Sequence, residues 1–76
     1  MSKEYLFLKD MPFSREDVET TYNRFYEIIT EEAKSYVTYW DNHRNKYAFY
    51  VTLANEEEYK KLILKLKGHN YTVESI

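Results

Sequence analysis

The sequence predicts one small α+β domain in which a strand and a helix are followed by two strands, a second helix and a last strand. Four short runs rich in apolar, β-branched and aromatic residues have the length of strands, and two longer stretches place apolar residues at helical spacing. The chain has 76 residues, of which 43% are apolar and 18% aromatic, and this composition excludes a disordered chain. We therefore expect residues 1–76 to form a single domain.

The first strand is expected at residues 4–9, an apolar run that ends before an Asp-Met-Pro sequence. Ser14 then begins a helix, because its hydroxyl and the carboxylate of Asp17 are spaced as a capping box. Phe13 precedes the cap as the first half of a hydrophobic staple, and the helix should run to about Lys34. Its apolar face consists of Val18, Tyr22, Phe25 and Ile29.

Two further strands, at residues 35–41 and 46–53, are separated by a short polar loop and predict a β-hairpin. Asn55 is expected to cap the second helix, and Gly68 to end it. The apolar stripe of this helix consists of Tyr59, Leu62, Ile63 and Leu66. A last short strand is expected at residues 71–74.

Each predicted helix is apolar along one side, so both can cover the same face of a four-stranded antiparallel sheet. Right-handed connections then favour a ferredoxin-like βαββαβ sandwich with the sheet order 4-1-3-2. Such a sheet has one face under the helices and one open face.

Alternation along each strand predicts which side chains occupy the open face. We expect the inward set to be Leu6, Leu8, Val37, Tyr39, Phe49, Val51, Leu53, Tyr71 and Val73. We expect the outward set to be Tyr5, Phe7, Lys9, Tyr36, Thr38, Trp40, Lys46, Ala48, Tyr50, Thr52, Thr72 and Glu74. Among the four predicted strands, the facing is least determined for residues 35–41. The outward set contains five aromatic rings, and a contiguous aromatic patch on a small protein marks a binding surface.

Two segments of the chain resemble the motifs of RNA-recognition-motif domains. Residues 6–14, Leu-Phe-Leu-Lys-Asp-Met-Pro-Phe-Ser, are similar to the strand 1 motif, and residues 45–53 are similar to the strand 3 motif. The resemblance implies the same fold and the stacking of single-stranded RNA bases on the sheet. It also implies that Phe7 takes the stacking position of strand 1.

Two alignments of the strand 3 motif remain open. In one, Tyr47, Ala48 and Phe49 match the aromatic–small–aromatic core of the motif. In the other, Lys46 and Tyr50 take the basic and second aromatic positions. We prefer the second alignment, because it buries Phe49 together with the apolar residues that follow at alternate positions. Neither alignment supplies the glycine of the motif.

A protein partner suits the predicted open face better than RNA does. RNA binding requires cations along the phosphates, and here Lys9 and Lys46 are opposed by Glu74, with Arg44 nearby in the hairpin loop. A protein partner requires an aromatic anchor with a polar rim. We therefore expect a non-catalytic binding module, a small regulator or inhibitor, for which a phage protein acting on a host factor would be one source. The expected binding residues are Tyr5, Phe7, Lys9, Tyr36, Trp40, Lys46 and Tyr50.

Single-stranded RNA is the alternative partner on the same face, and a homodimer through the sheet is a third arrangement. The net charge of −2 gives no global attraction to phosphate backbones. No apolar run is long enough to span a bilayer, and the first residues lack the layout of a signal peptide. We therefore expect a cytoplasmic protein without a membrane partner.

The sequence contains no catalytic or metal-binding motif. The absence of cysteine excludes a disulfide framework and a thiolate metal site. His43 and His69 fall in predicted loops beside opposite edge strands, which favours two ordinary surface histidines. We expect no enzymatic activity, no cofactor and no metal.

Overall fold

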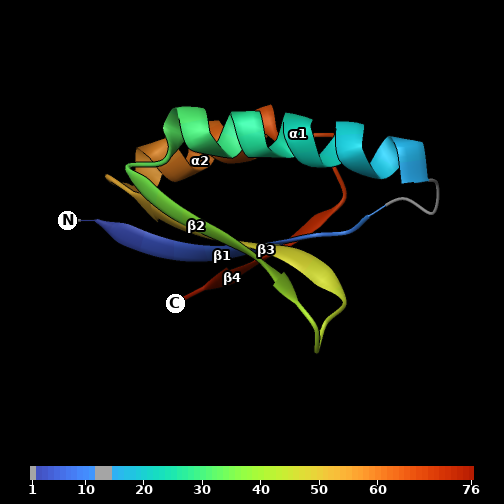
Figure 1. The fold of residues 1–76 in the computed structure, drawn as a ribbon. Coiled ribbons are helices and arrows are strands. Elements are labelled where there is room, and N and C mark those ends of the chain that lie inside the picture. Colours follow the sequence, from blue (N-terminus) through green and yellow to red (C-terminus); the bar gives the residue numbers. More distant parts are fainter. Residues whose placement is uncertain (1, 12–14) are drawn as a thin grey trace.

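The computed structural model describes residues 2–11 and 15–76, and its elements follow the predicted order (Figure 1). They are β1 (Lys3–Lys9), α1 (Arg15–Glu32), β2 (Ser35–Asp41), β3 (Lys46–Leu53), α2 (Glu56–Lys65) and β4 (Tyr71–Ser75). The predicted roles of Phe13 and Ser14 at the start of α1 lie outside the described residues.

The four strands form one antiparallel sheet in the order β2-β3-β1-β4, which is the predicted order 4-1-3-2 read from the other edge. Both helices lie on the same side of this sheet, and the opposite side is open (Figure 1). The predicted α+β class and βαββαβ topology are therefore confirmed, and the arrangement is that of a ferredoxin-like sandwich.

The main core fills the space between the helices and the sheet. Phe25 of α1 lies at its centre, with its ring centroid 5.0 Å from that of Phe49 in β3 and 6.5 Å from that of Phe7 in β1. The fully or nearly buried members of this core are Tyr5, Phe7, Phe25, Ile29, Phe49, Val51, Leu53, Leu62 and Leu66. Aromatic rings of this kind each bury a large apolar area, which a domain of this size needs.

The ends of α2 follow the local signals of the sequence. The side chain of Asn55 accepts a hydrogen bond from the backbone N–H of Glu58 at 3.0 Å, which satisfies one of the free donors of the first turn. Gly68 has a φ of +93°, a left-handed conformation that glycine adopts at little cost after a helix. The predicted cap at Asn55 is confirmed, whereas α2 ends at Lys65 with Leu66 as its C-cap, so Gly68 lies in the turn that follows and does not itself end the helix.

The predicted facing of β3 and β4 is also confirmed. Phe49, Val51 and Leu53 belong to the main core, whereas Ala48 and Tyr50 lie on the open side. Tyr71 and Val73 of β4 pack against the main core, as expected.

The predicted facing of β1 is wrong. Tyr5 stacks on Tyr59 of α2 with ring centroids 4.2 Å apart, and Phe7 is 0% exposed within the main core. Lys9 follows the same alternation and is only 2% exposed. Leu6 and Leu8, which were predicted to lie inside, occupy the open face.

The reason lies in the position of β1 between β3 and β4. A central strand that is buried on both sides reads as a continuous apolar run, so alternation alone cannot decide its facing. The register places Phe7 directly opposite Phe49, and residues opposite each other share a face. The larger rings thus lie on the side of the sheet that the helices cover, and the smaller leucines lie on the open side.

The predicted facing of β2 is also wrong, because every residue from Tyr36 to Trp40 is aromatic or β-branched and alternation does not decide between the two faces. Tyr36, Thr38 and Trp40 lie opposite Val51, Phe49 and Tyr47 of β3, which places them on the helix side. The hydroxyl of Tyr36 lies 3.0 Å from that of Tyr26 in α1, which agrees with this facing. Val37 and Tyr39 lie opposite Tyr50 and Ala48 and therefore face the open side.

Candidate interaction surface

The centre of the open face is a small apolar cluster on the two central strands. Leu6, Leu8 and Ala48 are 8%, 3% and 0% exposed, although none of the described helices or strands covers this side of the sheet. The side chain of Tyr50 packs against them. The middle of the open face is therefore largely covered by its own neighbouring side chains.

Tyr50 is fixed in this position by its hydroxyl group. The hydroxyl donates a hydrogen bond to Glu4 Oε2 at 2.7 Å, which links β3 to the first residues of β1. This hydrogen bond to a carboxylate, with the negative charge of Glu4 beside it, raises the pKa of Tyr50 above its ordinary value. Tyr50 is thus a neutral ring whose polar end already has a partner.

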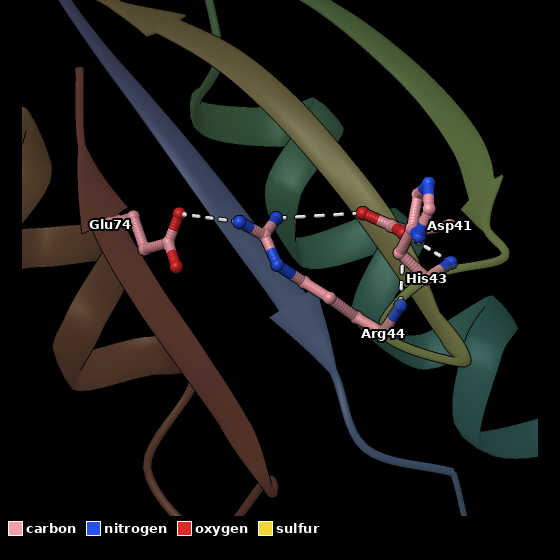
Figure 2. Close-up of polar contacts among 4 residues, drawn as sticks. All are labelled: Asp41, His43, Arg44 and Glu74. Carbon is pink, nitrogen blue, oxygen red and sulfur yellow. Dashed lines mark hydrogen bonds and ion pairs between the residues drawn. The ribbon is translucent and has the colours of Figure 1, made fainter.

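Arg44 crosses the open face from the β2–β3 hairpin to the opposite edge strand (Figure 2). Its guanidinium group lies 3.4 Å from Asp41 at the end of β2 and 3.4 Å from Glu74 in β4. Asp41 also accepts hydrogen bonds from the backbone N–H groups of His43 and Arg44, at 3.0 and 3.1 Å. In Figure 2 the side chain passes in front of β1, on the face of the sheet that carries the apolar cluster.

The charges of the open face are arranged as pairs with an excess of carboxylates. Lys46 Nζ lies 2.7 Å from Asp10 Oδ1, and Arg44 is held between two carboxylates. Glu4 adds a further negative charge beside Tyr50. In the described part of the chain, therefore, the cations on this face are already neutralised, and phosphate groups would have to displace carboxylates to reach them.

Lys9 has a structural role on the helix side. Its ammonium group donates hydrogen bonds to the backbone oxygens of Asp10, at 3.0 Å, and of Asn70, at 2.7 Å. It also lies 5.6 Å from the centre of the Phe25 ring, within the range of a cation–π contact. Burial lowers the pKa of Lys9, and the charge of Asp10 partly opposes this effect. The side chain ties the end of β1 to the start of β4.

A cleft of about 530 Å³ opens beside this lysine, between the end of β1, the first half of α1 and residues 68–70. Arg24 and His69 line the cleft together with Lys9. Burial, the charge of Lys9 and the charge of Arg24 all lower the pKa of His69, which favours the neutral imidazole. His69 is thus half-buried against Phe25, with ring centroids 5.8 Å apart, and is not a freely exposed histidine.

The largest concentration of exposed apolar side chains lies on β2. Tyr36, Val37, Tyr39 and Trp40 are 42%, 59%, 45% and 42% exposed. Among the described residues, only Leu64 and Ile76 are further large apolar side chains with comparable exposure, and they lie elsewhere. We call the four residues of β2 the β2 strip. It projects rings on both sides of an edge strand, because successive residues alternate in facing.

Two rings of the β2 strip are held in place, since each has an aromatic partner on the helix side. Tyr36 meets Tyr26 edge-to-face with centroids 5.7 Å apart, and Trp40 meets Tyr47 edge-to-face at 4.9 Å. Such contacts hold the rings in defined orientations while leaving part of each ring in water. A preoriented aromatic ring loses little side-chain entropy when a partner covers it.

The structure disperses the seven predicted binding residues. Lys46 and Tyr50 lie on the open face, as expected, and Tyr36 and Trp40 lie on the helix side of β2 but remain exposed. Tyr5, Phe7 and Lys9 belong to the buried side of β1. The stacking ring that the RNA-recognition resemblance implied at Phe7 is therefore not on the surface.

Sequence reasoning missed Val37 and Tyr39 as exposed residues. The signal that could have identified them is the pairing with β3, because Val37 lies opposite Tyr50 and Tyr39 opposite Ala48. Once Phe49 is placed in the core, this register fixes the facing of all of β2.

No group of three or more histidine, cysteine or carboxylate side chains arranged for a metal ion occurs among the described residues. No helix in the described ranges, 2–11 and 15–76, is long and apolar enough to cross a membrane. Comparison of the chain with protein-family models, with curated proteins and with solved structures gave no match. The class of protein defined by fold and surface is thus a small ferredoxin-like domain with an exposed aromatic edge strand.

Proposed function

We propose that this protein is a non-catalytic binding module, a cytoplasmic regulator or inhibitor, that binds a protein partner through the β2 strip. The observation that carries the proposal is the concentration of exposed apolar side chains on one edge strand: four of them belong to β2. Isolated exposed apolar residues are normal, but a contiguous group on a small protein is typical of an interface.

The composition of the strip supports a protein partner. Tyrosine and tryptophan are the residues most enriched among the energetic centres of protein interfaces, and β2 presents Tyr36, Tyr39 and Trp40. An edge strand also offers unpaired backbone groups to which an extended peptide can add as a further strand. The strip therefore combines aromatic anchors with backbone hydrogen-bonding groups.

Single-stranded RNA is the alternative ligand of an RNA-recognition-like domain, and it has a narrower basis. In the described part of the chain, the strand register places two aromatic residues, Tyr39 and Tyr50, on the open face. Stacking would be available to them, but Arg44 and Lys46 are paired with carboxylates. Since phosphate contacts supply most of the affinity for nucleic acid, the charge pattern favours the protein partner.

The test is capture of partners from lysate with the wild-type protein and a Tyr39→Ser/Trp40→Ser variant, with and without nuclease. Leu64→Ser is the matched control, because Leu64 is 72% exposed but lies on α2. We expect a protein partner that survives nuclease, is lost with the double variant and is retained by the control. Partners that disappear on nuclease treatment, together with binding of a labelled single-stranded RNA that weakens steeply with salt, would favour the alternative instead.

A further inference from the structure

β2 is an edge strand without the usual protection against pairing. In the described part of the chain it pairs with β3 alone, so alternate backbone N–H and C=O groups on its outer side have no strand partner. Exposed edges are commonly blocked by lysine, proline, a bulge or a very short strand. β2 has seven residues and carries neither charge nor proline from Tyr36 to Trp40.

The opposite edge differs in these respects. β4 is five residues long, and its Glu74 is held by Arg44 from the hairpin. A charged and short edge is a poor template for another strand. The two edges of the sheet are therefore not equivalent, and β2 is the one open to pairing.

The sequence of β2 is nearly symmetric about its central residue, Thr38. If two copies of the strand pair antiparallel around Thr38, residues whose numbers are equally distant from 38 lie opposite each other. Tyr36 then faces Trp40, Val37 faces Tyr39, and Thr38 faces Thr38. Opposed residues share a face of the sheet, and in β2 Tyr36 and Trp40 do lie on the helix side whereas Val37 and Tyr39 lie on the open side.

Each of these cross-strand pairs is of a favourable type. Aromatic–aromatic, aromatic–β-branched and Thr–Thr pairs are the combinations that stabilise antiparallel strands. The charges agree as well: Asp41 faces Ser35, so the two Asp41 carboxylates stay at opposite ends of the paired strands. Lys34, which is exposed and precedes the strand, faces Asn42 of the second copy and lies next to its Asp41.

We infer that two copies of this chain associate through β2, antiparallel and centred on Thr38, to form a continuous eight-stranded sheet with twofold symmetry. This inference rests on the proposed function in using the same strip, and it names a second copy of the chain as the occupant. Twofold pairing is isologous, so one self-complementary strand is sufficient and no second surface is needed.

The exposed area of the β2 strip sets the expected strength of the dimer. The three rings of the strip are 42–45% exposed, which corresponds to roughly 200–350 Å² of aromatic surface for each copy. A standard stable interface buries about 800 Å² on each partner. The dimer should therefore be weak and concentration-dependent, with a Kd on the order of micromolar or above.

The experiment is sedimentation velocity over a concentration series from about 1 μM to 1 mM, a range that brackets the expected Kd. Val37→Lys and Tyr39→Glu are made separately. Each should weaken self-association about tenfold, because each replaces an apolar residue in both of the symmetry-related Val37–Tyr39 pairs. Leu64→Lys on α2 is the matched control and should dimerise like the wild type.

Mixing the two variants tests the register itself. In a mixed dimer, one pair joins the new lysine to the new glutamate, and the other pair is the unchanged Tyr39 and Val37. The mixed dimer should therefore be tighter than either variant alone, as expected when residue 37 lies opposite residue 39. Circular dichroism establishes that each variant is folded.

The inference would be overturned by a wild-type protein that stays monomeric up to the highest concentration, by variants that dimerise normally, or by a mixture no tighter than the single variants. A monomer that still captures a partner lost with Tyr39→Ser/Trp40→Ser would overturn self-pairing alone and leave the proposed function standing. Self-association in which the mixture is tighter than either variant, with no other protein captured, would support the inference. It would also contradict the part of the proposed function in which the protein regulates a second protein.

Discussion

The ring of Phe7 lies between β3 and β4 on the helix side of β1, where it contacts Phe25 and Tyr71. Its exposure is 0%, although its sequence environment resembles a motif whose aromatic residue faces solvent. The physical reason is the volume available on each side: the helices provide partners for a large ring, and the open side does not. A motif of alternating residues carries no information about which side of the sheet the helices cover.

This placement predicts a large stability effect at residue 7. Phe7→Ala should lower the free energy of unfolding by about 3–5 kcal/mol, because it removes a buried ring and leaves a cavity. A chain of 76 residues is stable by roughly 4–11 kcal/mol in total, so this variant should be close to unfolded. Chemical denaturation monitored by circular dichroism measures the change.

Phe7→Leu and Val37→Ala provide the comparison. The leucine variant should lose only about 1–2 kcal/mol, since most of the volume is kept, whereas Val37→Ala should change the free energy of unfolding by about 0.5 kcal/mol or less. A folded Phe7→Ala protein with wild-type stability would show that this ring is on the surface after all.

At the scale of elements, an ion pair joins the ends of the two helices. Lys65 of α2 donates a hydrogen bond to Glu32 at the end of α1 and lies 3.8 Å from Glu31. The hydrogen bond from Lys65 lowers the pKa of Glu32, and the hydrogen bond to Glu32 raises the pKa of Lys65. The pair also places a basic residue in the last turn of α2, where it complements the helix dipole.

The direction of the Glu32 shift gives a pH dependence. Because the folded-state pKa lies below the unfolded value, the contribution of the pair is fully present above the unfolded pKa and is lost as the pH falls through the folded value. Lys65 is largely exposed, so screening limits the effect, and we expect a decrease in Tm of about 2 °C. Thermal melts of the wild type and of Glu32→Gln between neutral pH and about pH 3 would show this decrease as a difference between the two proteins that closes below the ordinary glutamate pKa.

Glu32→Gln isolates the contribution of this carboxylate. The variant should begin with a slightly lower Tm at neutral pH and should converge with the wild type in acid. Parallel curves for the two proteins over the whole range would mean that the pair contributes nothing to the docking of the helices.

At the scale of the whole molecule, Arg44 connects parts of the chain that are far apart in sequence. It extends from the β2–β3 hairpin to Glu74 in β4, and in Figure 2 its side chain passes in front of β1. Its ion pairs are exposed and 3.4 Å long, so their electrostatic contribution is small. We expect its larger effect to be on the surface, because Leu6 and Leu8 lie on the face of the sheet that its aliphatic stem crosses.

Arg44→Ala should therefore change the surface more than the stability. We expect a loss of at most about 1 kcal/mol in the free energy of unfolding, together with increased binding of a fluorescent dye that recognises exposed apolar surface. Arg44→Lys keeps much of the aliphatic stem and should bind less dye than the alanine variant. Equal dye binding by the wild type and Arg44→Ala would show that the cluster is covered without this side chain.

The order and limits of the elements could be predicted from the sequence because their signals are local. The cap at Asn55, the left-handed Gly68 and the polar loop between residues 41 and 46 each act within a few residues of the chain. Two one-sided helices and four strands then admit few topologies, and the βαββαβ sheet order follows from right-handed connections. These features need no knowledge of which residues meet across the sheet.

The facing of β1 and β2 depended instead on contacts between distant segments. β1 is apolar at every position from Tyr5 to Leu8, so its register against β3, with Phe7 opposite Phe49, decides which rings enter the core. Lys9 was expected at the surface because an ammonium group needs hydrogen-bond partners, which water supplies there. In the folded protein, the backbone oxygens of Asp10 and Asn70 are its partners instead. Sequence alone thus determined the fold and the presence of an aromatic surface. Only the tertiary structure decided that this surface is the edge strand β2, because burial depends on what lies above and beside each strand, and those neighbours are remote in the chain.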